Sequence, residues 1–305
     1  PYHSPDGLGW EVGDGLPRID FGEAAVAVAA GQKGFVSVGT GNGASPNTPI
    51  VAFSPDGATW DQIEPEDLPE AQVAWLTDVV AGPHGFIIVG NRNPPLEEHG
   101  SARLLVWVSS DGRTWSETDI ADLGSRSALT ATRAATDSGW AAVTPDWQDD
   151  ADSTVGVWTS SDVIGWSEIE TQGAPPAAAA RAYIGAAPLI VADDRWVLTP
   201  IEGEGVPTAW VSTDDGVTWN EHDVGGAPTS TGFFTSDVAA TDAGLILVGS
   251  LDTADEQGQS FVSHSVDGTS WQQCPTTAEF TAVASFGDGL VLVDAAGSTM
   301  VWNEP

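Results

Sequence analysis

Short runs of apolar residues alternate with polar turns along the whole chain, and the same unit recurs. Each unit contains a strongly apolar run that starts at a glycine, as in residues 34–39, 85–90 and 244–249. A shorter run precedes it, as in residues 78–81, and another follows it, as in residues 104–108. Such runs, β-branched or aromatic and bounded by Gly, Asp, Asn and Pro, are typical of β-strands. No segment has a convincing helical periodicity.

Each unit ends in a short segment that runs from a serine through an aspartate and a glycine to a tryptophan. The clearest copies are S-P-D-G-A-T-W and S-T-D-D-G-V-T-W, and the fourth copy, S-S-D-V-I-G-W, lacks the Asp-Gly step. The six tryptophans lie 50 to 55 residues apart and are Trp10, Trp60, Trp115, Trp166, Trp219 and Trp271. This period is the length of a four-stranded propeller blade.

The aspartates of these segments are expected to have a structural role. A carboxylate there accepts backbone N–H bonds across a tight turn, glycine takes positive φ, and the tryptophan packs between blades. We call these segments Asp turns, and their aspartates are Asp6, Asp56, Asp111, Asp162, Asp214 and Asp267. The fourth turn is expected to have an altered geometry, because Val163 and Ile164 replace the Asp-Gly step.

The pattern predicts an all-β fold, a six-bladed β-propeller of four-stranded antiparallel blades that forms one domain over residues 1–305. The last unit supplies only three strands, at 281–285, 290–294 and 299–302. A spare strand near residues 9–12 is expected to complete that blade, since this closure removes an exposed sheet edge. On this prediction, deletion of residues 1–14 costs most of the stability.

The Asp turns resemble the Asp box, S-x-D-x-G-x-T-W, of sialidases, xyloglucanases and other propellers, and Ser212 to Trp219 match it best. The wider repeat resembles sialidase-like Asp-box (BNR-like) repeat proteins of actinobacteria. The resemblance covers essentially the whole chain and is specific for the fold rather than for a function. It implies that Asp turns lie on one face of the ring and ligand sites on the other, the loop face.

Charge and cysteine content narrow the function classes. The chain has 9 Lys+Arg against 44 Asp+Glu, a formal net charge of −35, which argues against nucleic acid and anionic membranes as partners. No apolar run is long enough for a transmembrane helix, so no membrane insertion is expected from this segment. Cys274 is the single cysteine, so no intrachain disulfide forms. We expect an extracellular or cell-envelope location.

Several acidic and aromatic residues are candidates for a site on the loop face. The densest acidic run offers oxygen ligands for Ca²⁺, the one cofactor that the sequence suggests, although charge runs are more often only solvated. Its candidate metal ligands are Asp146, Asp149, Asp150 and Asp152, and the candidate binding residues are Trp147 within it, Arg18, Arg92 and Arg126. Phe233 and Phe234 are expected to be loop aromatics; such residues can stack on sugar rings, although they more often anchor a loop by hydrophobic contact.

Asp78 and Asp237 are the candidate catalytic residues. They occupy the same position in units that are three apart, on opposite sides of a six-unit ring, where alanine, threonine or proline stands in other units. Two carboxylates across a sugar suit glycoside hydrolysis. The alternative is a carboxylate that caps local backbone N–H groups. Sialidase chemistry needs an arginine triad and a Tyr–Glu pair, for which the sequence gives no diagnostic context.

Three functions therefore remain open. The first is a binding module for a glycan, cation or protein partner on the acidic loop face. The second is a glycoside hydrolase, sialidase-like or xyloglucanase-like, that uses channel-facing carboxylates. The third is a scaffold subunit of a surface assembly.

Overall fold

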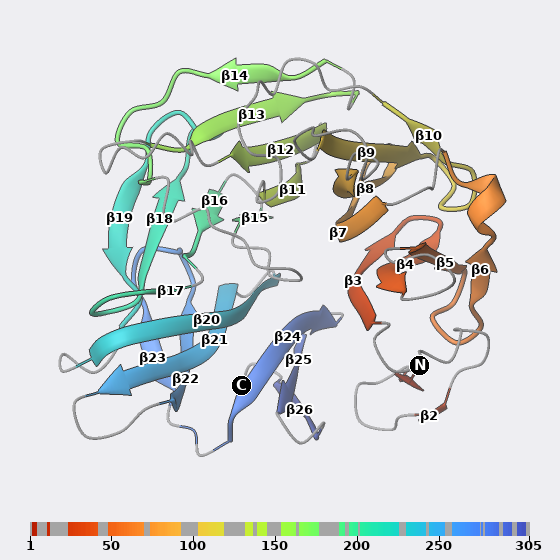
Figure 1. Cartoon of the computed structure of the whole chain (residues 1–305). Helices are drawn as coiled ribbons and strands as arrows, with labels where there is room; N and C mark the ends of the chain where they lie inside the picture. Colours follow the sequence, from red (N-terminus) through yellow and green to blue (C-terminus); the bar gives the residue numbers. More distant parts are fainter. Residues whose placement is uncertain are drawn as a thin grey trace, which may run out of the picture.

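In the computed structural model, small antiparallel sheets stand side by side in a ring, so the chain is an all-β, six-bladed β-propeller as the repeat predicts (Figure 1). The structure describes residues 2–4, 11–12, 24–41, 48–69, 74–92, 103–118, 132–136, 139–144, 154–162, 165–176, 189–192, 195–200, 202–225, 230–241, 244–253, 258–274, 276, 278–286, 289–294 and 298–302.

The first three blades have four strands each, in chain order from the ring centre to the rim. Blade 1 consists of β3 (Ala24–Gly31), β4 (Gly34–Gly41), β5 (Thr48–Ser54) and β6 (Asp61–Ile63). Blade 2 consists of β7 (Ala74–Gly82), β8 (Gly85–Arg92), β9 (Arg103–Ser109) and β10 (Ser116–Glu117). Blade 3 consists of β11 (Thr132–Thr136), β12 (Gly139–Thr144), β13 (Gly156–Ser160) and β14 (Ser167–Ile169).

The remaining blades depart from this pattern. Blade 4 consists of β15 (Leu189–Ala192), β16 (Arg195–Leu198), β18 (Thr208–Ser212) and β19 (Asn220–Asp223). Blade 5 consists of β20 (Ser230–Thr241), β21 (Gly244–Thr253), β22 (Gln259–Ser265) and β23 (Gln272–Cys274), with β17 (Glu202–Gly203) added beside β20. Blade 6 has three described strands, β24 (Phe280–Phe286), β25 (Gly289–Asp294) and β26 (Thr299–Trp302).

Helix plays almost no part in the described residues. The single turn of 3₁₀ helix, η1 (Pro65–Asp67), follows β6. In the described part of the chain, no helix is long and apolar enough to cross a membrane.

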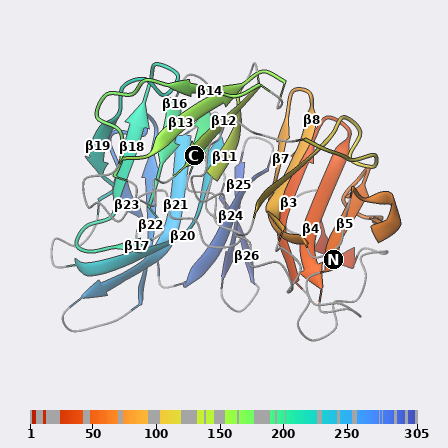
Figure 2. The same ribbon diagram turned by 45° about the horizontal axis from the view of Figure 1, so that its top comes forward.

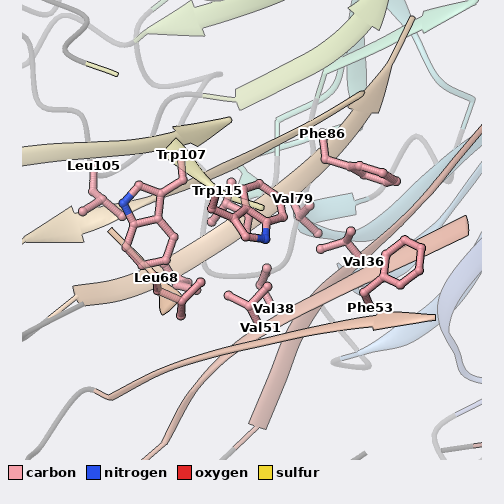
Figure 3. Close-up of a cluster of buried hydrophobic side chains, with 12 residues drawn as sticks. Val36, Val38, Val51, Phe53, Leu68, Val79, Phe86, Leu105, Trp107 and Trp115 are labelled. Atoms are coloured by element: carbon pink, nitrogen blue, oxygen red, sulfur yellow. The ribbon is translucent and has the colours of Figure 1, made fainter. Parts of the chain in front are cut away.

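The apolar core lies in clusters between neighbouring blades. Between blades 1 and 2, Val36 and Val51 pack with Leu76 and Trp107, and all four side chains are essentially fully buried (Figure 3). Blades 2 to 5 each contribute to two of these clusters and so bury both faces of their sheets, which explains why their second strands are largely apolar rather than alternating. Figure 2 shows the blades tilted against one another around the ring.

The Asp turns have one recurring hydrogen-bond pattern. In the blade 1 turn, Asp56 Oδ1 accepts the backbone N–H groups of Ala58 and Thr59, both at 2.9 Å. Ser54 Oγ accepts the N–H of Gly57 at 2.8 Å, and Trp60 Nε1 donates to the Gly57 carbonyl at 2.9 Å. Equivalent bonds recur at Asp111, Asp214 and Asp267. These bonds provide acceptors for backbone N–H groups of the turn that form no hydrogen bond between strands.

Two carboxylates show the electrostatic consequence of this pattern. The backbone N–H of Thr59 is the main cause of a lowered pKa at Asp56, and that of Thr114 is the main cause at Asp111. In the fourth turn Asp162 Oδ1 accepts from Gly165 N at 2.8 Å, while Val163 and Ile164, the residues expected to alter it, lie outside the described residues.

Among the described residues, the N-terminal strand does not pair with the last blade as the sequence predicts. β2 (Glu11–Val12) pairs with β1 (Tyr2–His3) in a separate two-stranded sheet, and β26 is paired with β25. The register is that of the other Asp turns: His3 pairs with Glu11, as Phe53 pairs with Asp61 in blade 1. The strand close in sequence is the partner of β2, rather than the distant β26.

Candidate functional site

The inner strands of blade 5 reach further than those of the other blades. β20 has 12 residues and β21 has 10, and their far ends carry a third strand, β17, taken from the β16–β18 loop of blade 4. Because blade strands alternate in direction, these ends lie on the loop face, away from the Asp turns. We define the blade 5 extension as residues 202–203, 230–235 and 249–253.

One face of the blade 5 extension belongs to the core. Phe233 and Leu251 form a cross-strand pair, and both pack into the cluster that contains Val197 and Val211 of blade 4. Gly203 pairs with Phe233, and a Cβ added there would lie 2.5 Å from the phenyl ring. Glycine therefore allows β17 to lie directly over this ring.

The other face carries an exposed aromatic ring among polar groups. Phe234 is 43% exposed, although its neighbour Phe233 is buried. Phe234 pairs with Glu202 on one side and with Ser250 on the other, so the three side chains are directed to the same face. The Glu202 side chain is exposed. This arrangement places a carboxylate and a hydroxyl beside the phenyl ring.

Asp252 adds a second carboxylate at the end of this face. It follows Ser250 by two residues and pairs with Gly232. Its Oδ1 accepts the N–H of Gly258 at 2.9 Å, and its backbone carbonyl accepts Thr231 Oγ1 at 3.2 Å. The loop between β21 and β22 is thus tied back to β21, which fixes the carboxylate in place.

Asp237 lies deeper on the same face, next to blade 6. A β-bulge separates it from Thr235, so that Asp237 pairs with Val248. Its Oδ1 accepts the N–H of Val238 at 2.8 Å, and its Oδ2 accepts the N–H of Val283 on β24 at 3.0 Å. Burial raises the pKa of this carboxyl to about 6, and the two backbone N–H bonds oppose the rise.

Asp78 repeats the local part of this geometry in blade 2. It also follows a bulge, and its Oδ1 accepts the N–H of Val79 at 2.8 Å. Blades 2 and 5 are on opposite sides of the ring, as the repeat numbering implies (Figure 1). The structure therefore gives the two aspartates equivalent positions without bringing them side by side.

Most other candidate residues fall outside the described part of the chain. Arg92 is the last residue of β8, but its side chain is outside that part. The remaining candidates outside it are Asp6, Trp10, Arg18, Arg126, Asp146, Trp147, Asp149, Asp150 and Asp152. Within the described residues, no group of three or more His, Cys, Asp or Glu side chains could hold a metal ion.

Two features of the candidate site were missed at the level of sequence. The first is β17 (Glu202–Gly203), a strand that no pattern in the sequence predicts. The second is the difference between Phe233 and Phe234, which lie in a strand and not in a loop and are directed to opposite faces of the sheet. The alternating run before Asp237 was the signal that could have separated them, because alternation assigns adjacent residues to opposite faces of a sheet.

Comparisons with known proteins agree on the fold. The sequence matches no protein-family model and no curated protein. The β-propeller domain of the Trilobed protease from Pyrococcus furiosus, described as having an open velcro topology, has a TM-score of 0.54 at 10% identity, over 93% of this chain and 82% of that chain. A protein of unknown function from Dyadobacter fermentans DSM 18053 has a TM-score of 0.52 at 12% identity, over 92% and 93% of the two chains.

A sialidase is also among the similar structures. The Trypanosoma rangeli sialidase bound to the inhibitor DANA has a TM-score of 0.50 at 14% identity, and the match covers 90% of this chain. The chain spans about half of that enzyme, since the match covers 53% of it. At such identities these likenesses show the propeller fold and leave the function to the site itself.

Proposed function

We propose that this protein is an extracellular or cell-envelope propeller that binds a neutral glycan on the blade 5 extension. The observation that carries the proposal is the exposed ring of Phe234 with Glu202 and Ser250 on the same sheet face. A phenyl ring packs against the C–H face of a sugar, while carboxylates and hydroxyls accept and donate hydrogen bonds at its edge.

The charge of the protein supports a neutral ligand over an anionic one. A formal net charge of −35 repels polyanions at long range. Glu202 and Asp252 add negative charge on the sheet face that carries Phe234. Carboxylates are acceptors and suit the many hydroxyl donors of a neutral sugar.

A binding experiment with two single variants tests this proposal. Wild-type protein is titrated with a panel of neutral and acidic oligosaccharides by isothermal calorimetry. We expect binding of at least one neutral glycan and a loss of tenfold or more in affinity with Phe234→Ala. Glu202→Gln should weaken the same ligand. Absence of binding to every neutral glycan, or unchanged affinity in both variants, contradicts the proposal.

Glycoside hydrolysis is the second candidate, and the environment of Asp237 favours it. A carboxyl whose pKa is raised to about 6 by burial keeps its proton in mildly acidic solution, as a general acid requires. Asp78, at the equivalent position on the opposite side of the ring, is the other candidate carboxylate. Release of reducing ends from a polysaccharide panel tests this function: release that Asp237→Asn and Asp78→Asn abolish supports hydrolysis, and no release from any substrate rejects it.

A further inference from the structure

A cavity of about 520 Å³ lies between blades 3 and 4 on the Asp-turn side of the ring, away from the blade 5 extension. Thr159, Ser167 and Ile169 line it from β13 and β14 of blade 3. Trp196, Asp215 and Val217 line it from blade 4. Its volume is within the range of small-ligand sites, roughly 300–1,000 Å³.

Comparison with the equivalent positions between blades 1 and 2 explains why side chains do not fill this cavity. There Phe53 and Asp61 form a cross-strand pair in the register that Thr159 and Ser167 have in blade 3. Arg113, from the Asp turn of blade 2, places its guanidinium 4.4 Å from the centre of the Phe53 ring and binds Asp61 Oδ2 at 2.8 Å. Three large or charged side chains therefore occupy the first junction.

The third junction has shorter side chains at all three positions. Val217, like Arg113, stands two residues before the tryptophan of its Asp turn. Thr159 replaces the phenyl ring, and Ser167 replaces the carboxylate. The third junction has Thr, Ser and Val where the first has Phe, Asp and Arg. It therefore lacks the cation–π contact and the ion pair of the first junction, and the unfilled space is the cavity.

The blade 4 wall of the cavity is fixed by hydrogen bonds from outside the turn. Gln172 N donates to the Val217 carbonyl at 2.8 Å, and Trp219 N donates to the Gln172 carbonyl at 2.9 Å. Trp196 and Trp219 pack edge to face, with ring centroids 6.5 Å apart. Because these contacts already order the wall, a ligand that binds there spends little binding free energy on ordering it.

Asp215 distinguishes this turn from the others. It is the additional residue in S-T-D-D-G-V-T-W, and at φ 56° it is the one non-glycine residue with positive φ among the described residues. Backbone conformations of this kind cost about 1–3 kcal/mol and cluster at functional sites. The insertion brings an exposed carboxylate to the rim of the cavity.

We infer that this cavity is a second binding site, and that it takes one unit of a neutral saccharide. Its polar lining includes the hydroxyl-bearing residues Thr136, Thr159, Ser161 and Ser167 together with Asp215, and none of the described residues that line it is Lys or Arg. Hydroxyls both donate and accept, which matches a polyol, and an apolar ligand would leave them unpaired at a cost. The absence of cations from the lining disfavours anions. The apolar wall of Ile169 and Trp196 suits the C–H face of a sugar.

The side chains of the first junction provide a template for substitutions that fill the cavity. The variant Thr159→Phe/Ser167→Asp/Val217→Arg installs the three side chains of the first junction in the third. Val217→Arg alone is the second variant, because it changes one exposed residue and leaves the strands intact. Saturation-transfer NMR and calorimetry with methyl glycosides of neutral hexoses and pentoses give the readout, and thermal unfolding verifies the fold.

The site is independent of the proposed function, since Phe234 lies on the opposite face of the ring. We expect a methyl glycoside to bind the wild type and Phe234→Ala equally, and both filled variants to lose at least tenfold in affinity. Asp215→Asn should weaken the same ligand. The inference is overturned if no methyl glycoside binds the wild type, if binding survives in both filled variants, or if Phe234→Ala alone removes it.

Discussion

The Asp237 carboxylate of blade 5 accepts a hydrogen bond from the backbone N–H of Val283 in blade 6, with 3.0 Å between Oδ2 and N. The bond joins the inner strands of two blades that share no ladder hydrogen bonds. Because a β-bulge shifts β20 at this point, the side chain reaches the neighbouring strand instead of packing within its own sheet. The inter-blade contact thus depends on an ionisable group.

The first prediction concerns the pH dependence of this contact. The folded-state pKa of Asp237 is raised to about 6 from an ordinary 3.8, so folding favours the protonated form. Its contribution to stability is therefore complete below pH about 4 and is lost as the pH rises through about 6. Relative to Asp237→Asn, the wild type should lose on the order of 3 kcal/mol between pH 4 and pH 7. Urea unfolding at several pH values measures this difference.

The exposed substitution Glu204→Gln serves as the control for that experiment. Its unfolding free energy should follow the wild type at every pH, because Glu204 is exposed at the end of β17. Parallel curves for the wild type and Asp237→Asn would show that the carboxyl is not protonated preferentially in the folded state.

The second prediction concerns the Asp turns. The backbone N–H of Thr114 is the main cause of the lowered pKa of Asp111, so the stabilisation that Asp111 provides is present above pH about 4 and is lost as the pH falls through its folded pKa. Asp111→Asn should cost about 1 kcal/mol at pH 7, since solvent screens this largely exposed group, and less at pH 2. Guanidinium unfolding at both pH values tests it, with the exposed Glu221→Gln as control.

The third prediction compares two glycines that both have positive φ. Gly85 has φ 126°, and a Cβ there would lie 2.1 Å from the Ser109 carbonyl oxygen. Gly258 has φ 71° with nothing within 4 Å. Gly85→Ala should cost at least about 3 kcal/mol and Gly258→Ala about 1 kcal/mol, as measured by thermal unfolding. Equal losses would mean that the steric contact at Gly85 relaxes freely.

The fourth prediction compares the two adjacent phenylalanines of β20. Phe233 is buried against blade 4, so Phe233→Ala should cost about 3–5 kcal/mol. Phe234 is 43% exposed, so Phe234→Ala should cost less than about 1 kcal/mol while it removes glycan binding. Chemical unfolding of both variants gives the comparison. A large destabilisation by Phe234→Ala would assign that ring to the fold instead of to a ligand.

The fifth prediction concerns the N-terminal hairpin. Because β2 pairs with β1 and not with β26, removal of residues 1–12 should leave the six-bladed ring folded, with a melting temperature within a few degrees of the full chain. Circular dichroism on heating measures this. Loss of cooperative unfolding on truncation would show that Glu11–Val12 supports the last blade in solution.

The sequence by itself determined the number of blades, their order and the turns between their third and fourth strands. These features are local, because an antiparallel hairpin is specified by residues within about ten positions. Each hairpin of this kind carries one of the repeated tryptophans, so the number of tryptophan repeats gives the number of hairpins. The fourth strands show this most clearly, because β6, β10, β14, β19 and β23 all begin one residue after the tryptophan of their Asp turn.

Only the tertiary structure decided which segments far apart in sequence lie together. The addition of β17 to β20, the bond from Asp237 to Val283, and the cavity opposite Val217 all depend on contacts between blades. The residue spacing within one repeat does not specify these contacts, because each contact joins a residue of one unit to a residue of the next unit. The pairing of β2 shows the opposite case: its partner His3 lies eight positions from Glu11, so this hairpin forms without the entropy cost of joining the chain ends.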